Sequence, residues 1–584
     1  MRALERTAEI ERNPRRTLPV LLEELAARYE AAPALLSTDA SLSYRELAQR
    51  ANRYAHWALA EGLEPGDVVG LLLKNCPEYL AIWLGLTRVG VTVALLNTHL
   101  TGEPLQHSLR IVAPRGLIVE AGLSERLLTG SAAVASSLRC WIHGEGAPSL
   151  PRLDEALEDC SQEPVSAAER EAPSLADRAL YIYTSGTTGL PKAAVVSHYR
   201  LMQWSHWFSG LMGITPADRL YDCLPMYHSV GGVVATGATL VGGGTVVVRE
   251  RFSASGFWQD IRAQRCTIFQ YIGELCRYLT NGLNAEQAAA EHTLRLACGN
   301  GLRADVWQAF QSRFRIPAIL EYYAATEGTF SLYNCEGRVG SIGRIPPFLS
   351  HRYPVALVRC DPSSGSPLRD PEGRCIRCQS GEAGEAIGRI AAAGAGGAGA
   401  RFEGYADAEA TRGKVLRDVF EPGDAWYRTG DLMSRDTEGF YYFVDRIGDT
   451  FRWKGENVST TEAAAVLASC HGVTDVAVYG VSVPGTEGRA GMAALVVGPE
   501  FDLAVLGREL AGKLPEYARP VFLRIVPSLE VTGTFKLRKQ ELADEGYDPA
   551  RVSDPLYFNA APRGQYESLD ALRHQRIVAG LEKL

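Results

Sequence analysis

The sequence predicts an α/β protein with a large N-terminal domain and a small α+β C-terminal domain. Three observations lead to this prediction. The length of 584 residues is too long for one core, apolar runs alternate with helix-like segments, and the pattern changes after Arg446. Because βαβ alternation produces parallel strands, the large domain is expected to contain two parallel-type β-sheets flanked by helices. The predicted domains are residues 1–446 and 447–584.

Apolar residues at helical spacing run from Leu18 to about Gly62, with a short extended interruption around Leu42. Apolar runs separated by helix-like segments then predict a first parallel sheet, with strands at 68–73, 91–95 and 116–119. The alternation returns after Tyr181. It predicts a second parallel sheet, whose elements include strand 245–248, helix 257–264, strand 266–271 and helix 275–279.

The low-complexity segment AAAGAGGAGA, Ala391 to Ala400, carries no charge and cannot pack a core, so a surface insertion is expected there. Ser459 followed by Glu462 forms a capping-box pattern and predicts the start of the first helix of the small domain. Short apolar runs then predict the strands of this domain at 475–480, 492–497 and 521–526.

The composition excludes several classes of protein. A hydrophobic share of 46% and a charged share of 22% are those of an ordinary soluble globular protein. The net charge of −8 gives no general attraction to nucleic acid. We find neither an apolar run of about 18 residues nor a secretory signal. The twelve scattered cysteines fit a reducing cytosol, and the one CxxC pair, Cys375 and Cys378, lacks the second pair of a typical zinc site.

The most informative segment, TSGTTGLPK at 184–192, follows the apolar run 179–183. Glycine lets the backbone turn its N–H groups toward an anion, hydroxyl groups donate further hydrogen bonds, and lysine supplies positive charge. It is not a Walker A loop, because that motif has four residues between its glycines and ends in Gly-Lys-Ser/Thr. A polar hairpin turn is the alternative. We predict a phosphate-binding loop whose ligands are Thr184, Ser185, Gly186, Thr187, Thr188, Gly189 and Lys192.

This segment resembles the phosphate-loop signature of the adenylate-forming superfamily, which comprises acyl-CoA synthetases, luciferases and peptide-synthetase adenylation domains. Later segments resemble the other motifs in the family order: CGNG at 298–301, YYAATE at 322–327, YRTGDL at 427–432, DRIGDTFRWKG at 445–455 and TGTFK at 532–536. The strings PMYHS, FQYIGELCRYL, FRWKGENVSTTE and YGVSVPGTEGRAGMAAL are most similar to fatty acid transport proteins and very long-chain acyl-CoA synthetases. The resemblance adds a β-barrel-like subdomain to the large domain and makes the small domain mobile.

The resemblance implies ATP, Mg²⁺ and coenzyme A as cofactors and assigns residues to each. Thr326 and Glu327 would hold phosphate and Mg²⁺, with Thr184 as a second metal ligand, because a hard cation prefers oxygen. Lys536 would stabilise charge as the acid attacks ATP. The remaining nucleotide contacts would be Gly299, Asn300 and Gly301 at the adenine, Tyr323 stacked near it, and Asp431 with Arg446 at the ribose.

For the acyl group, the resemblance places His228 near the carboxylate, with a buried structural histidine as the alternative. The small residues that follow, including Gly231 and Gly232, would line an acyl tunnel, although close helix packing explains glycine equally well. The small domain would turn about Gly448 so that Lys536 leaves the site and a CoA-channel loop enters, formed by Lys454 and Gly455. One departure from the family pattern is Ala324, which replaces the glycine of the YGxTE motif.

The function implied is that of an ATP-dependent long-chain or very long-chain fatty acyl-CoA synthetase, which converts fatty acid, ATP and CoA into acyl-CoA, AMP and pyrophosphate. Two alternatives are an acyl-adenylate ligase that loads a carrier protein and a fatty acid uptake protein that works by metabolic trapping. A cytoplasmic location is expected, with at most peripheral contact at the inner face of the membrane. The sequence leaves the acyl chain length and the oligomeric state open, with a homodimer as one option.

Overall fold

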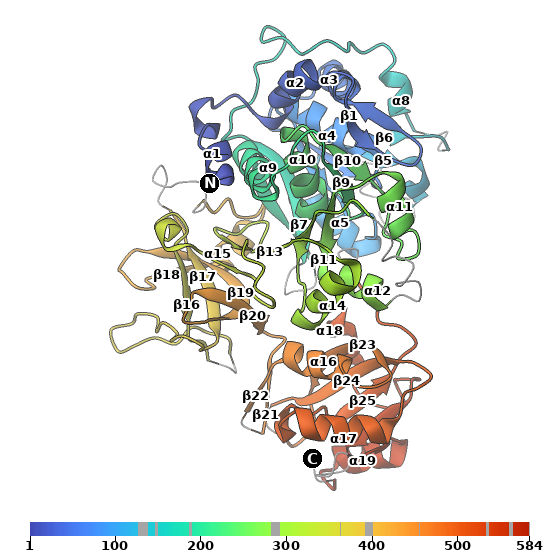
Figure 1. The fold of residues 1–584 in the computed structure, drawn as a ribbon, viewed down its shortest axis with the longest axis vertical. Helices are drawn as coiled ribbons and strands as arrows, with labels where there is room; N and C mark the ends of the chain where they lie inside the picture. The colour runs from blue at the N-terminus through green and yellow to red at the C-terminus, as the bar shows by residue number, and fades with distance from the viewer. Residues whose placement is uncertain are drawn as a thin grey trace. The chain divides into compact units, whose positions relative to one another are not determined.

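The computed structural model describes residues 1–125, 138–146, 150–185, 190–281, 292–361, 364–391, 401–454, 456–486, 488–532, 537–559 and 565–582. The contacts between Cα atoms divide the chain into two compact units. The first unit contains Met1–Tyr353 and Ile390–Val415, and the second contains Pro354–Arg389 and Leu416–Leu584. The predicted fold class is confirmed, with two largely parallel sheets in the first unit and an α+β arrangement near the C-terminus (Figure 1).

The first sheet has the strand order β6-β5-β3-β4-β7-β8, in which only β8 runs antiparallel to its neighbour. The expected strands at 68–73, 91–95 and 116–119 are present in it. Its inner strands are fully buried on both faces, which explains their continuous apolar runs. The strands are β3 (Val68–Leu72), β4 (Thr92–Leu95), β5 (Gly116–Glu120), β6 (Arg139–His143), β7 (Arg178–Ser185) and β8 (Pro191–Ser197).

The second sheet of the first unit has the order β15-β14-β13-β12-β11-β9-β10-β1-β2 and is parallel from β13 to β1. Strand β1 was not predicted from the sequence, because its four residues lie between two strongly helical segments. The strands are β1 (Pro33–Leu36), β2 (Ser41–Ser43), β9 (Arg219–Asp222), β10 (Thr245–Val248), β11 (Ile268–Ile272), β12 (Leu296–Asn300), β13 (Ile319–Ala324), β14 (Ser331–Asn334) and β15 (Gly343–Arg344).

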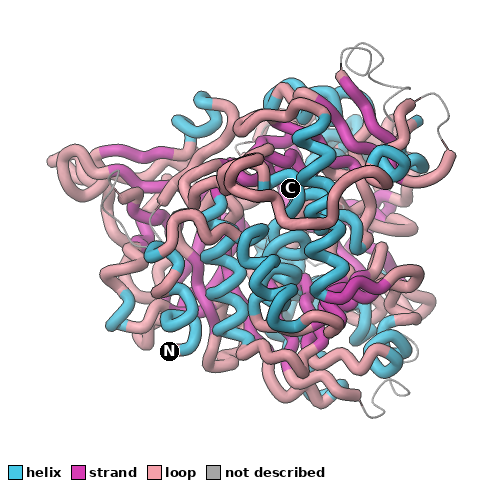
Figure 2. The backbone as a smooth tube through the Cα atoms, turned by 90° about the horizontal axis from the view of Figure 1, so that it is seen from above, coloured by secondary structure: helices cyan, strands magenta, loops and turns pink. Residues whose placement is uncertain are grey.

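Helices of the first unit pack with both sheets into one apolar core, formed by side chains from β3, β4, β7 and β10 together with α2, α3, α4 and α9. In Figure 2 these helices are cyan and the strands magenta. A full capping box, in which Ser43 and Glu46 exchange hydrogen bonds, starts α3. The main helices are α1 (Arg2–Thr7), α2 (Leu18–Tyr29), α3 (Tyr44–Ala60), α4 (Pro77–Arg88), α5 (Gly102–Val112), α8 (Leu153–Ala156), α9 (His198–Met212), α10 (Thr236–Val241), α11 (Phe257–Ala263), α12 (Gly273–Asn281), α14 (Ala304–Phe314) and α15 (Ala408–Gly413).

The second unit begins with an antiparallel sheet in the order β16-β17-β19-β20, where a barrel-like subdomain was expected. Its strands are β16 (Val355–Val358), β17 (Gly384–Arg389), β19 (Ala425–Arg435) and β20 (Phe440–Arg446), and the short strand β18 (Val415–Arg417) pairs with β19. This sheet belongs to the same compact unit as the C-terminal residues, so the boundary between the two units differs from the domain boundary predicted at Arg446. That boundary stays a prediction about which part rotates.

The C-terminal part of the second unit has its own core around a five-stranded sheet. Ser459 caps α16 as predicted, because its hydroxyl accepts the N–H of Glu462. The expected strands appear as β23, β24 and β25. The elements are β21 (Phe451–Trp453), β22 (Glu456–Val458), α16 (Thr460–Ala468), β23 (Val473–Val481), β24 (Ala490–Val497), α17 (Leu503–Lys513), β25 (Phe522–Ile525), α18 (Lys539–Glu545), β26 (Leu556–Asn559), β27 (Tyr566–Ser568) and α19 (Ala571–Val578).

Across the described ranges, no helix combines the length and the apolar character that crossing a bilayer would require. The insertion predicted at 391–400 lies, apart from Ala391, outside the described residues.

Candidate active site

Two motifs that lie about a hundred residues apart in the sequence meet in the first unit. The Ser229 hydroxyl, from the PMYHS segment, lies 3.1 Å from the hydroxyl of Thr326, and both side chains are buried. His228 is next to this contact and half-buried, and its backbone N–H donates to the carbonyl of Pro225. Thus His228 lies one residue away from a direct contact with the segment that carries Glu327.

A buried arginine of α9 fixes the backbone on both sides of Glu327. The Arg200 guanidinium donates to the carbonyl oxygens of Thr326, at 2.6 Å, and Gly328, at 3.2 Å. These are charge-assisted bonds, and they hold the carbonyl groups of the residues immediately before and after the glutamate. The carboxylate of Glu327, itself only 7% exposed, is therefore presented from a backbone that has little freedom to move.

The segment predicted to bind phosphate connects β7 and β8, which pair as antiparallel strands. Thr184 pairs directly with Lys192, and Ser185 pairs with Pro191. Directly paired residues of an antiparallel ladder project from the same face, so the Thr184 hydroxyl and the Lys192 ammonium share one side of the hairpin. The predicted phosphate ligands at 186–189 lie outside the described residues.

Sequence reasoning missed a tyrosine that joins these two parts of the site. The Tyr405 hydroxyl donates a 2.5 Å hydrogen bond to Glu327 Oε1 and also bonds the side chain of Thr184. Burial, followed by the negative charge of Glu327, raises the pKa of Tyr405, so the phenol keeps its proton at neutral pH. No local signal distinguishes this residue among 24 tyrosines, since its partners are distant in the sequence.

The predicted adenine segment follows β12. Gly299 and Asn300 end this strand, and Gly301 has a φ of +75°, which turns the chain away from the sheet. Glu321 on β13 accepts the backbone N–H of Leu302 at 3.1 Å, which holds this turn to the neighbouring strand. Burial raises the pKa of Glu321 to about 8. This buried glutamate was also not predicted.

Tyr323, the residue predicted to stack near adenine, is half-buried on β13. Its ring stacks on Phe330, with ring centres 5.9 Å apart. The next residue, Ala324, is exposed, so the methyl group that replaces the usual glycine adds no buried volume. Tyr323 and Phe330 thus form a stacked aromatic pair, and the contact of Tyr323 with adenine stays a prediction.

The predicted ribose ligands belong to the second unit. Asp431 on β19 lies opposite Arg446 on β20, and Arg446 Nε is 3.3 Å from Asp431 Oδ1. Asp431 is 7% exposed, whereas the Arg446 side chain is about half exposed. The pairing predicted from the sequence is thus present as an ion pair across two adjacent strands.

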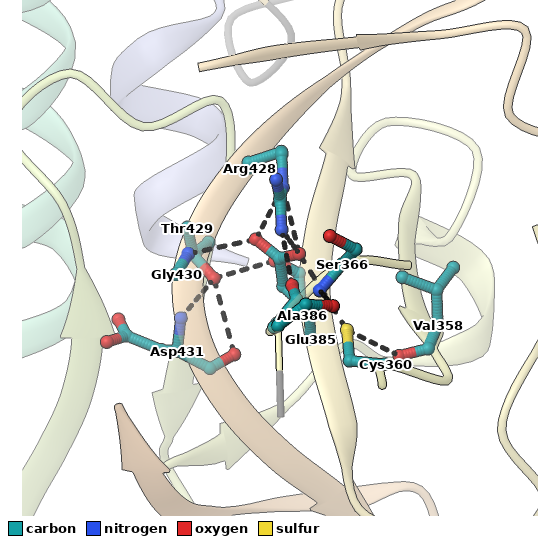
Figure 3. A network of polar contacts seen from close by, with 11 residues as sticks. Val358, Cys360, Ser366, Glu385, Ala386, Arg428, Thr429, Gly430 and Asp431 are labelled. Atoms are coloured by element: carbon teal, nitrogen blue, oxygen red, sulfur yellow. Dashed lines mark hydrogen bonds and ion pairs between the residues drawn. The ribbon is translucent and has the colours of Figure 1, made fainter. Parts of the chain in front are cut away.

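A buried network, drawn in Figure 3, shapes the turn that presents Asp431. Glu385, which is fully buried on β17, accepts hydrogen bonds from the Arg428 guanidinium, the shortest at 2.7 Å, and from the N–H of Gly430 at 3.1 Å. The Thr429 hydroxyl accepts the N–H of Asp431 and donates to a β17 carbonyl. The backbone of the turn predicted to bind the ribose is thereby attached to β17 at two points.

Glu385→Ala is expected to destabilise this part of the second unit by about 3–5 kcal/mol, because it leaves the Arg428 guanidinium without its buried partner. Amide hydrogen exchange at β17 and β19 measures this local loss. Glu382→Ala is the matched control, since Glu382 forms a more exposed pair with Arg359 and should cost about 1 kcal/mol at most. Equal exchange in the two variants would show that Glu385 has no special role.

The residues predicted for hinge and CoA channel also lie in the second unit. Gly448 has a φ of +99°, a backbone conformation that favours glycine, and Lys454 pairs with Glu516 at 3.1 Å. Asp445 accepts the N–H of Thr460 at the start of α16, so the chain just before Gly448 is attached to that helix. Gly455 and Lys536 lie outside the described residues, and their roles stay predictions.

A model of the AMP-binding enzymes matches residues 22–376, and the model of the AMP-binding enzyme C-terminal domain matches residues 462–536. The chain belongs to the AMP-binding enzyme family. The first match contains the hairpin of Thr184 and the segment of Glu327. The second ends at Lys536.

Within this family, the chain is 42% identical to long-chain fatty acid transport protein 1 of Mus musculus over 572 residues, which are 97% of this chain and 88% of that protein. Among solved structures, an anthranilate CoA ligase in complex with anthranoyl-AMP has a TM-score of 0.76 at 21% identity and covers 90% of this chain and 96% of its own. A fatty acyl CoA synthetase of Mycobacterium tuberculosis has a TM-score of 0.63 at 22% identity, with coverages of 91% and 98%. These structures confirm that the fold is that of AMP-binding enzymes.

The magnesium ion expected in an AMP-binding enzyme fits the oxygen atoms gathered around Glu327. The buried carboxylate of Glu327 and the hydroxyl of Thr184 both bond the hydroxyl of Tyr405, and the Thr326 hydroxyl, on the residue before Glu327, contacts Ser229. The described residues contain no group of three or more His, Cys, Asp or Glu side chains that could hold a metal ion. A single carboxylate suits Mg²⁺, which is usually bound by one or two carboxylates together with substrate phosphates.

The two glycines assigned to the acyl tunnel lie in a π-helical turn, Val230–Ala235. A Cβ atom added to Gly232 would lie 1.9 Å from the carbonyl oxygen of Met226, and one added to Gly231 would lie 2.7 Å from that of Leu224. Close approach of two backbone segments therefore requires glycine at both positions, which is the packing explanation left open by the sequence. Their place in an acyl tunnel stays a prediction.

Proposed function

We propose that this chain is an ATP-dependent long-chain or very long-chain fatty acyl-CoA synthetase. The observation that carries the proposal is the buried cluster in which Tyr405 joins Thr184 of the phosphate hairpin to Glu327. Such a cluster suits the binding of a nucleoside triphosphate with its cation. We propose a long-chain fatty acid as the substrate because the relative is a long-chain fatty acid transport protein. We propose CoA as the acceptor because the similar structures are an anthranilate CoA ligase and a fatty acyl CoA synthetase.

In the proposed reaction the fatty acid carboxylate attacks the α-phosphorus of ATP, and the bond to pyrophosphate breaks. The thiol of CoA then attacks the acyl carbonyl, and AMP leaves. Lys192 would offset phosphate charge, and Lys536 would do so at the reacting carboxylate and α-phosphate. Magnesium, held by Glu327 and Thr184 with the phosphates, would neutralise the charge of the pyrophosphate group.

The partners proposed for this chain are a fatty acid, ATP and CoA, with His228 near the acid and the Lys454 to Gly455 loop near CoA. We place the protein in the cytoplasm, with any membrane contact limited to the inner surface.

Purified protein incubated with Mg-ATP, CoA and acids of graded length tests the proposal. We expect acyl-CoA and AMP to form in equal amounts, with the highest kcat/KM for long or very long acids. If the protein releases pyrophosphate but forms acyl-CoA with none of these acids, and instead acylates a carrier protein that bears a phosphopantetheine arm, the carrier-loading ligase is favoured. If no acid causes pyrophosphate release under any condition, both the CoA synthetase and the carrier-loading ligase are contradicted.

A further inference from the structure

Tyr405 belongs to a segment that is attached to the phosphate hairpin along its backbone. The N–H of Val195 donates to the carbonyl of Gly404, and the N–H of Ala406 donates to that of Ala193. This pairing extends the sheet beyond β8 by a few residues. The N–H of Tyr405 itself donates to the Thr411 hydroxyl at 2.9 Å. Backbone hydrogen bonds therefore fix the position of the tyrosine independently of its side-chain contacts.

The same segment is tied to α9 by charged groups. Glu403 accepts hydrogen bonds from the backbone and side chain of Ser197, at 2.8 and 2.5 Å, and lies 3.5 Å from the Arg200 guanidinium. Arg200 is also the residue that holds the backbone on both sides of Glu327. One set of contacts thus fixes Tyr405 and Glu327 relative to each other.

The side chain of Tyr405 is 7% exposed and ends between the two predicted metal ligands. A phenol can donate one hydrogen bond and accept others. Here the hydroxyl donates to the Glu327 carboxylate and bonds Thr184, while the ring lies 5.9 Å from the Lys192 ammonium. Thr184 is the last residue but one of β7 and Glu327 follows β13, so the phenol joins groups that belong to different sheets of the first unit.

We propose that Tyr405 is a positioning residue for the magnesium site. Its hydroxyl holds Glu327 and Thr184 in the geometry that accepts Mg²⁺ with the phosphates of ATP. This inference rests on the proposed function. A carboxylate has about four acceptor positions, so a phenol and a cation can share it. Partners of this kind orient metal ligands, and their loss commonly reduces metal affinity or activity about 10- to 100-fold.

The test compares Tyr405→Phe with Tyr199→Phe. Tyr405→Phe keeps the ring and its contact with Lys192 and removes only the hydroxyl. Tyr199 is a matched control in the same unit, because it is also buried, its ring lies 4.0 Å from the guanidinium of Arg401, and its hydroxyl accepts a bond from Gln203. Tyr199 has no contact with Glu327 or Thr184 among the interactions of the described residues.

Two measurements are made on each full-length protein. Electron paramagnetic resonance follows the binding of Mn²⁺ in the presence of ATP, which needs no turnover, and a Mg²⁺ titration follows pyrophosphate release. For Tyr405→Phe we expect the Mn²⁺ dissociation constant and the Mg²⁺ concentration at half-maximal rate to rise about 10-fold or more. Tyr199→Phe should leave both unchanged. Thermal unfolding of both variants should stay close to that of the parent.

The inference is overturned if Tyr405→Phe binds Mn²⁺ with the parent affinity, or if both variants lose affinity together with stability, because the tyrosine would then only fill space. Tighter Mn²⁺ binding would also overturn it, since the phenol would then compete with the cation. A parent protein that shows no cation-dependent binding of ATP would contradict the proposed function itself. A parent that binds normally beside an unchanged Tyr405→Phe variant contradicts only this inference.

Discussion

Glu327→Gln is expected to lower the rate of acyl-adenylate formation by about 10²-fold or more. The substitution keeps the shape of the side chain but removes the negative charge that a hard divalent cation requires. Removing one preorganised electrostatic group from a reaction site commonly costs on the order of 10² to 10³ in rate. The hydrogen bonds that Arg200 donates to the carbonyl oxygens of Thr326 and Gly328 do not involve the Glu327 side chain, so they should survive the change. Pyrophosphate release at saturating fatty acid and varied Mg²⁺ measures the effect.

Glu336→Gln is the matched control, because Glu336 forms a partly exposed ion pair with Arg344 in the same unit and takes no part in the predicted site. It should change neither the rate nor the Mg²⁺ dependence. A Glu327→Gln protein that forms acyl adenylate at the parent rate, with the parent Mg²⁺ dependence, would remove Glu327 from the list of metal ligands.

The sheets of the first unit were predictable because their strands are buried on both faces. A parallel strand covered by helices reads as a continuous apolar run, as β3 and β10 do, and such runs have no competing explanation when turns and helices alternate with them. Strand β1 was missed, since its pairing with β10 links residues far apart in the sequence. Local pattern contains no information about such partners.

The site divides in the same way. Thr184 belongs to a segment with an unusual local composition, whereas Glu327 and Asp431 were assigned because their segments resemble family motifs. Tyr405 and Glu385 do their work through contacts with distant residues, and each looks ordinary among its sequence neighbours. Gly232 shows the reverse case, because the sequence identified the residue but could not distinguish a tunnel wall from a close backbone contact.

Lys536→Ala should separate the two half-reactions of the proposed enzyme. The family model for the C-terminal domain ends at this lysine, which we propose supplies positive charge only while the fatty acid attacks ATP. Adenylate formation should therefore fall about 10²- to 10³-fold. Thioester formation from supplied acyl adenylate should continue, because that step begins after pyrophosphate has left. Pyrophosphate release and acyl-CoA formation, measured in separate assays, report the two steps.

Two further variants make this result decisive. Lys513→Ala removes a lysine that forms an ion pair with Glu509 on the same helix, and both activities should stay at the parent level. Gly455→Leu places a bulky side chain where we propose that the CoA arm passes, so adenylate formation should persist while transfer to CoA stops. If Lys536→Ala and Gly455→Leu, both well folded, lose the two steps equally, one arrangement of the small domain must serve both reactions. In that case the proposed division of labour between Lys536 and the loop at Gly455 is wrong.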